Sequence, residues 1–349
     1  MNLIQSISST LKTWVFKKKL LKFSGRFRQD PEACFYCPEM CRFSCPTAET
    51  LRTNTATPRG KMSLLHLAEQ GYLAEQVAGS EETRLYFLEQ CTGCGRCTEF
   101  CVYENDVGSH LRNERAVYFK KTLEPSNIEA LLDHLRALEG KVLFCEPSRK
   151  IWWDTHPELV KKLGVSCVSD AEFPHIEWGW GKLPENQTES IGVALSKCNE
   201  ICVESAELGW FFVKGVKEER KVLQAEVRTV WQKFFSEFAA LEFSPDVVFH
   251  ESSYFSRLFP RLGISIPMYE RGFMPFHRGW NVWDCGGEGF YRHAHPKNAQ
   301  EMGVRFLADL QKDGRTIAKI VCQNLSCLSH LSGQTGARVV YWLDEVFHE

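Results

Sequence analysis

The sequence predicts an α+β multidomain fold in which a helical, cysteine-rich module precedes two α/β halves with largely parallel sheets. Three observations predict this fold. Eight of the 15 cysteines lie in two short clusters between residues 30 and 123, joined by a segment of helical periodicity. From residue 124 onward, amphipathic helices alternate with short apolar strands, a pattern typical of layered α/β structure. This second part also repeats weakly with a period of about 100 residues.

Composition indicates a globular chain of more than one domain. It has 349 residues, of which 44% are hydrophobic and 25% are charged, close to the averages for soluble domains. These values exclude wholesale disorder and fibrous repeats. No run of 18 or more apolar residues occurs, so the sequence predicts no helix that spans a bilayer.

Residues 1–29 are predicted to form a separate, basic amphipathic helix. Residues 1–30 contain seven lysines and arginines and one acid, within a chain of net charge -2. The apolar residues that share one helical face are Leu3, Ile4, Ile7, Leu11, Trp14 and Val15. We expect this helix either to make peripheral contact with an anionic membrane surface or to dock on its own protein. Basic charge confined to one short segment does not suit a nucleic-acid binder.

The cysteine content indicates a reducing, cytoplasmic compartment. A secreted disulfide scaffold would be short and would follow a signal peptide with an apolar core, whereas lysines interrupt residues 1–23. We therefore expect the thiols to be reduced and metal-bound. Two further readings of the basic N-terminal segment stay open: attachment to the inner face of the membrane, and a mitochondrial transit peptide.

The module at residues 30–123 carries two cysteine motifs whose spacing is typical of iron–sulfur clusters. C-x2-C-x3-C-x3-C-P and C-x2-C-x2-C-x3-C each put three thiolates on one short loop and a fourth a helical turn further on. Because the fourth cysteine of each motif faces the other cluster, the motifs predict two [4Fe-4S] clusters with crossed ligands. Cluster 1 is assigned Cys34, Cys37, Cys41 and Cys101, and cluster 2 is assigned Cys91, Cys94, Cys97 and Cys45.

Two zinc sites are the alternative, because eight cysteines also satisfy two sites of four ligands. Zinc modules usually pair two C-x2-C knuckles or use histidine across a longer gap, which favours the iron–sulfur interpretation. Two departures from the iron–sulfur pattern matter. One extra residue separates Cys37 from Cys41, and Val102 follows Cys101 where proline is usual.

The same residues carry a resemblance to a known family. Cys45-Pro46, the TPRGK of residues 57–61, a helical spacer and the second cysteine motif resemble the iron–sulfur subunits of glycolate oxidase, lactate-utilisation and anaerobic glycerol-3-phosphate dehydrogenase complexes. That family is related to heterodisulfide reductase. The resemblance extends over about residues 30–345 and implies a two-cluster, ferredoxin-type domain followed by paired cysteine-rich (CCG) domains.

The α/β part is predicted to divide into three pieces. A degenerate cysteine-rich half occupies residues 124–216, a bridging amphipathic helix lies within residues 217–243, and a second cysteine-rich half occupies residues 244–349. Four pairs of segments relate the halves: residues 142–150, 163–167, 177–181 and 201–209 parallel residues 247–255, 262–266, 283–289 and 320–328, respectively. Cys145, His250 and Cys322 end predicted strands, where ligands of open α/β sheets bind.

The second half retains part of the cysteine-rich motif that the resemblance implies. Ser252 and Ser253 stand where a cysteine is expected, and the turn at residues 284–287 begins with aspartate in place of cysteine. The candidate ligands for a third iron–sulfur or metal centre are His250, Asp284, Cys285, Cys322 and Cys327.

Two other interpretations of this second site stay open. Cys285 and Cys327, with His250, are also candidates for a catalytic redox thiol pair. Buried cysteines can equally be packed as small hydrophobic residues without any function.

The residues and the resemblance together predict an electron-transfer subunit of an oxidoreductase. It would pass electrons from a flavoprotein dehydrogenase subunit, with a donor of 2-hydroxy acid type, toward a quinone, a disulfide or another carrier. No phosphate-binding glycine motif follows a strand, so a flavin would belong to the partner. The alternatives are a disulfide reductase with its site in the C-terminal half, and an iron–sulfur sensing or interaction protein.

Overall fold

The computed structural model describes residues 32–39, 41–70, 88–101, 103–118, 125–169, 185–219, 221–258, 284–289, 291–311, 314 and 316–347. They fall into two compact units. The first contains the residues up to Cys91 together with Gly95–Leu111, and the second contains Thr92–Cys94 and the chain from Arg112 onward. No helix in these ranges is long and apolar enough to cross a bilayer. The predicted N-terminal helix at residues 1–29 lies outside the described residues.

The first unit is built from short helices, as the sequence predicts. They are α2 (Ala33–Tyr36), η2 (Arg42–Ser44), α3 (Pro46–Leu51), η3 (Asn54–Ala56), α4 (Pro58–Glu69), α6 (Arg96–Glu99) and the start of α7 (Val107–Tyr118). Proline occupies the first turn of α3, where its missing N–H has no helical partner to lose. The unit contains no strand among its described residues. Its cysteines lie within or between these short helices: Cys34 is in α2 and Cys97 is in α6.

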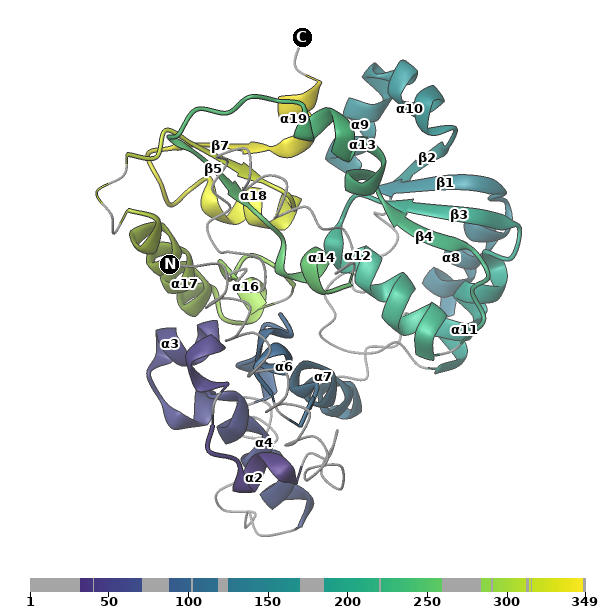
Figure 1. Cartoon of the computed structure of the whole chain (residues 1–349). Helices are drawn as coiled ribbons and strands as arrows, with labels where there is room; N and C mark the ends of the chain where they lie inside the picture. The colour runs from purple at the N-terminus through teal and green to yellow at the C-terminus, as the bar shows by residue number, and fades with distance from the viewer. Residues whose placement is uncertain are drawn as a thin grey trace, which may run out of the picture. The chain divides into compact units, whose positions relative to one another are not determined.

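The second unit begins with a parallel sheet in the order β2-β1-β3-β4. The strands are β1 (Gly140–Cys145), β2 (Ser166–Ser169), β3 (Cys198–Val203) and β4 (Glu226–Thr229). The helices are α8 (Pro125–Arg136), α9 (Pro147–Thr155), α10 (Pro157–Leu163), α11 (Glu185–Ala194) and α12 (Ala206–Trp210), which continues into the π-helix η4 (Phe211–Glu219). Figure 1 shows α9 and α10 on one face of the sheet and α8 and α11 on the other.

A second parallel sheet, in the order β5-β6-β7, follows. Its strands are β5 (Val247–His250), β6 (Lys319–Cys322) and β7 (Arg338–Tyr341). Its helices are α14 (Ser253–Leu258), α16 (Tyr291–Ala294), α17 (Pro296–Leu310), α18 (Leu325–Leu331) and α19 (Trp342–Val346). The two parallel sheets with helices on their faces confirm the predicted α+β multidomain class.

The internal repeat corresponds to repeated strands. The paired segments 142–150 and 247–255 contain β1 and β5, and the segments 201–209 and 320–328 contain β3 and β6. In both sheets these strands are adjacent and parallel. Cys145, His250 and Cys322 end their strands, as predicted. The segments 177–181 and 262–266 lie outside the described residues.

The structure differs from the sequence prediction within residues 217–243. Instead of one long bridging helix it has strand β4, paired in parallel with β3, followed by α13 (Val230–Ala239). Val227 and Thr229 are buried in the sheet, and Thr229 then caps α13 in a reciprocal capping box with Gln232. Pairing with an existing strand outweighs helical periodicity here. β4 and α13 follow β3 as β7 and α19 follow β6, although none of the repeated segments found in the sequence includes residues 217–243.

Aromatic packing and one buried ion pair join the two halves. Trp231 of α13 stacks on Phe249 of β5 and meets Trp342 of α19 edge to face. Arg149 of α9 donates from Nε to Glu204 Oε1 at 2.8 Å and from Nη1 to Asp344 Oδ1 at 2.9 Å. The Glu204 side chain is fully buried, so Arg149 supplies the counter-charge that its burial requires.

Replacing Arg149 by Met is therefore expected to lower the free energy of unfolding of this unit by about 3–5 kcal/mol, because it leaves the Glu204 carboxylate buried and unpaired. Denaturant unfolding followed by tryptophan fluorescence measures the loss. Adding Glu204→Gln to Arg149→Met should recover part of it. Lys150→Met is the control, since its exposed pair with Asp154 contributes little. Equal losses in Arg149→Met and Lys150→Met would contradict the assignment.

Candidate functional site

The first unit gathers thiols around Cys41. Burial, followed by the charges of the nearby Cys37, Cys34, Cys101 and Cys45 in that order, raises the pKa of the Cys41 thiol to about 12. Thiolates crowded in this way repel one another, and a bound cation relieves that repulsion and deprotonates its ligands. The chemistry of this donor set therefore fits an iron–sulfur cluster.

Asn105 links the ends of the two cysteine motifs. Its side-chain Nδ2 donates to Cys34 Sγ at 3.4 Å, and its backbone N–H donates to Cys101 Sγ at 3.4 Å. Cys34 begins the first motif and Cys101 ends the second, so one residue holds both sulfurs in the same neighbourhood. This is the arrangement that crossed ligation needs for cluster 1.

The TPRGK segment joins the cysteine loops to α4. Thr57 Oγ1 accepts the N–H of Gly60 at 3.0 Å and so caps the helix, whose first residue is Pro58. Arg59 Nη2 donates to the carbonyl of Phe35, between Cys34 and Cys37, at 3.2 Å. A Cβ at residue 60 would lie 1.9 Å from the backbone oxygen of Asn54, so this position requires glycine.

Lys61 completes the segment and is buried. Its Nζ donates to Thr47 Oγ1 at 2.8 Å and approaches Cys45 Sγ at 3.8 Å. A charged donor close to a thiol is a partner suited to a thiolate that ligates iron. The sequence alone marked this lysine only as part of the family motif.

Two glycines shape the loop of the second cysteine motif. Gly93 and Gly95, which alternate with its cysteines, have φ of 78° and 68°, a region in which side chains other than glycine are strained. Cys94 is buried, and Cys91 and Cys97 are half-buried. The spacing C-x2-C-x2-C thus includes the residues that its tight loop needs.

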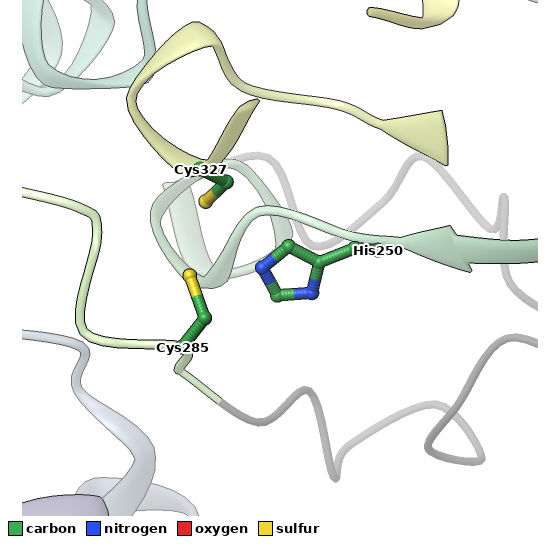
Figure 2. Close-up of side chains that lie close together, drawn as sticks. All are labelled: His250, Cys285 and Cys327. Atoms are coloured by element: carbon green, nitrogen blue, oxygen red, sulfur yellow. The ribbon is translucent and has the colours of Figure 1, made fainter. Parts of the chain in front are cut away.

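A second group of candidate ligands lies in the C-terminal half (Figure 2). His250 at the end of β5, Cys285 on the loop before α16 and Cys327 on α18 point toward one another. Their ligand atoms all lie within 4.8 Å of one another, and all three residues are buried. Nε2 of His250 is buried without a hydrogen-bond partner among the described residues. A histidine nitrogen and two sulfurs at these separations fit a transition-metal ion such as zinc, with one coordination position open.

The charges within this group are coupled. Burial alone would disfavour the thiolate, but a hydrogen bond from Cys327 and the charge of His250 lower the pKa of Cys285 well below its usual value. Burial and the hydrogen bond to Cys285 raise the pKa of Cys327 well above its usual value. Cys285 is therefore the first of the pair to ionise, and Cys327 retains its proton.

The other two predicted ligands lie outside this group of three. Asp284 Oδ1 accepts a hydrogen bond from the N–H of Gly286 at 2.7 Å, and this bond stabilises the turn. Cys322 is the register partner of His250 on β6 and is buried, which raises the pKa of its thiol well above the usual value. The glycines of the turn meet helices: a Cβ at Gly287 would lie 2.7 Å from His330 Cβ of α18.

Sequence reasoning missed a buried carboxylate network beside the three candidate ligands. Asn324 Nδ2 donates to Glu207 Oε2 at 3.1 Å and to Glu288 Oε1 at 3.1 Å. Glu288 also accepts from the N–H of Ser253 at 2.8 Å and from the hydroxyls of Ser252 and Ser253. The serines that replace the expected cysteines thus bind a carboxylate. Glu207 and Glu288 are far apart in sequence, so no local pattern could pair them.

Burial dominates the titration of this network. Burial, followed by the charges of Asp284 and Glu207, raises the pKa of Glu288 to about 8. Burial followed by the charge of Cys285 raises the pKa of Asp284 to about 6. Glu288 therefore holds a proton at neutral pH, and the carboxyl group can share hydrogen bonds with Asn324 and the serines without an unpaired buried charge.

Comparison with known proteins supports the first site. Residues 30–105 match the family model of the 4Fe-4S dicluster domain, and this segment includes all eight cysteines of the two motifs. The chain is therefore an iron–sulfur protein. No curated protein and no solved structure matches the chain.

Glu288→Gln tests the carboxylate network. Because Glu288 titrates near pH 8 when folded and near its ordinary value of 4.5 when unfolded, the unfolded chain releases a proton between these pH values that the folded chain keeps. The contribution of Glu288 to stability thus falls as pH rises through this window. Glutamine cannot ionise, so the free energy of unfolding of the variant should not fall in this way. Relative to that of the parent, it should rise by on the order of a few kcal/mol from about pH 5 to about pH 8.

Denaturant unfolding at both pH values measures this difference. Glu129→Gln, on the exposed face of α8, is the control and should leave the pH dependence unchanged. If Glu288→Gln and the parent lose stability in parallel across the window, Glu288 does not carry the extra proton.

Proposed function

We propose that this protein is the electron-transfer subunit of an oxidoreductase complex and binds two [4Fe-4S] clusters through its eight motif cysteines. The match of residues 30–105 to the dicluster domain carries the proposal. The clusters supply one-electron chemistry, while the chain supplies burial, spacing and hydrogen bonds that set their potentials. The thiols near Cys41 are its three assigned partners in cluster 1, Cys37, Cys34 and Cys101, and with a smaller effect Cys45 of cluster 2.

The partners follow from the resemblance of the motifs to the glycolate oxidase and lactate-utilisation iron–sulfur subunits. A flavoprotein dehydrogenase subunit, oxidising a 2-hydroxy acid, would supply the electrons, and a quinone, a disulfide or another carrier would accept them. Absence of a phosphate-binding glycine motif from the sequence supports a flavin on the partner. The basic N-terminal segment would bring the complex to an anionic membrane face.

Cluster content and crossed ligation can be tested together on anaerobically purified protein. We expect about 8 iron and 8 sulfide per chain and two cluster signals in the electron paramagnetic resonance (EPR) spectrum. Crossed ligation predicts that Cys34→Ser and Cys101→Ser disturb the same signal and that Cys45→Ser and Cys91→Ser disturb the other.

Cys198→Ser, which removes a buried thiol on β3, is the matched control and should retain both signals. Zinc without sulfide would reject the electron-transfer function. Pairing of Cys34 with Cys45 instead of Cys101 would reject the crossed arrangement alone.

A second candidate function rests on the grouping of His250, Cys285 and Cys327. These residues would bind a third metal centre or form a redox thiol pair that reduces a substrate disulfide. Two thiols that form a disulfide release two electrons and two protons, so the pair would exchange two electrons with a substrate while each cluster carries one. The low pKa of Cys285 supports a thiolate that attacks a disulfide or binds a metal.

Cobalt binding distinguishes these two roles. A third metal centre predicts that protein with its iron–sulfur clusters intact, freed of other bound metal, takes up one Co²⁺ with thiolate absorption. Cys285→Ser and Cys327→Ser should abolish this absorption while the iron of the first unit is retained. Cys202→Ser, a buried thiol on β3, should behave as the parent. No cobalt uptake, with reversible loss of two thiols in the parent only, would instead favour the redox pair. If neither property depends on Cys285 and Cys327, the second function is wrong.

A further inference from the structure

The most unusual charge in the first unit is the ammonium group of Lys61. Lys61 is 1% exposed, although lysine is among the residues least often fully buried. The structure shows two polar neighbours for Nζ, Thr47 Oγ1 at 2.8 Å and Cys45 Sγ at 3.8 Å. Lys61 forms no ion pair with a carboxylate in the part of the chain that the structure describes. A buried cation without a counter-ion is costly, so this position calls for negative charge.

Cys45 is where that negative charge would arise. Thr47 Oγ1 lies 3.1 Å from Cys45 Sγ as well as beside Lys61, so hydroxyl, ammonium and sulfur form one contact group. A cysteine that ligates a cluster is a thiolate, and it shares the cluster's charge. Lys61 therefore has a counter-ion when Cys45 binds iron, and this pairing explains a buried lysine that the fold alone does not require.

Asn105 contacts the other ligand set through uncharged groups. Cys34 and Cys101 accept hydrogen bonds from the side-chain amide and the backbone N–H of Asn105, both of which are neutral donors. Donors of either kind stabilise a reduced cluster, but a full positive charge in a buried setting does so more strongly than an amide dipole. The two clusters thus receive unequal electrostatic support from these two residues.

We propose that Lys61 raises the reduction potential of the cluster bound through Cys45 and so makes it the preferred acceptor of an electron from the cluster bound through Cys34 and Cys101. This inference rests on the proposed electron-transfer function. It assigns Lys61 a tuning role: the residue binds no iron, and it acts through the sulfur of Cys45. Transfer of one electron toward the Cys45 cluster would be favoured, which gives electron transfer between the two clusters a direction.

A redox titration of the cluster-loaded, full-length protein, followed by EPR, tests the proposal. Lys61→Met should lower the midpoint of one cluster by a tenfold change in its one-electron equilibrium, or about 59 mV, and leave the other cluster nearly unchanged. The cluster that moves should be the one whose signal Cys45→Ser disturbs. Lys61→Arg, which keeps the charge, should remain close to the parent. Lys150→Met removes an equivalent charge from an exposed site and should move neither midpoint.

Thr47→Val is a second variant that keeps Lys61 but removes the hydroxyl that holds it. It should shift the same midpoint in the same direction by less, and it carries the test if Lys61→Met loses iron. Unchanged midpoints in iron-loaded variants, equal shifts of both clusters, or an equal fall in Lys61→Arg would overturn the role of Lys61. These outcomes leave the proposed function intact, whereas parent protein without cluster signals would reject the function itself.

Discussion

The α/β unit depends on one requirement, which is that the two carboxyl groups buried where its halves meet, those of Glu207 and Glu288, have a hydrogen-bond donor. Asn324 meets it by donating from one amide nitrogen to Glu207 of the first half and Glu288 of the second. Burial, followed by the charges of Asp284 and Glu207, raises the pKa of Glu288, so Glu288 keeps a proton. The contact also anchors the 284–289 loop, which supplies Cys285, against β5 and α18, which supply His250 and Cys327.

Equivalent positions of the two halves serve different purposes. Arg149 and Glu204 of the first half form the buried ion pair that joins it to Asp344. Their counterparts in the repeat are Tyr254 and Gln323, and Gln323 Oε1 accepts the N–H of Ser252 at 2.9 Å. In the first half, the residues that follow the strand ends therefore join the two halves. The second half has the uncharged Tyr254 and Gln323 there, beside the candidate ligands His250, Cys285 and Cys327.

The sulfur atoms of the cysteine module also receive hydrogen-bond donors. Burial, followed by the crowding of its thiols, raises the pKa of Cys41, and donors come from residues outside the cysteine motifs. Asn105 serves Cys34 and Cys101, and Lys61 approaches Cys45. Such contacts are how proteins set the potentials of clusters that are chemically alike. The TPRGK segment brings these functions together because it caps α4, holds the first cysteine loop and buries Lys61.

The sequence by itself determined the features that depend on short spacing. Cysteines three or four residues apart specify iron–sulfur loops, and alternating apolar segments specify parallel strands that end at Cys145, His250 and Cys322. Only the tertiary structure decided which distant groups meet. Strand β4 exists because β3 offers it hydrogen bonds, although residues 217–243 have helical periodicity. Glu207 and Asn324 meet because they follow β3 and β6, whose ends two parallel sheets bring together, and Glu288 reaches them from the 284–289 loop. Lys61 reaches Cys45 only through the packing of α4. Local periodicity carries no record of such contacts, because burial and long-range pairing create them.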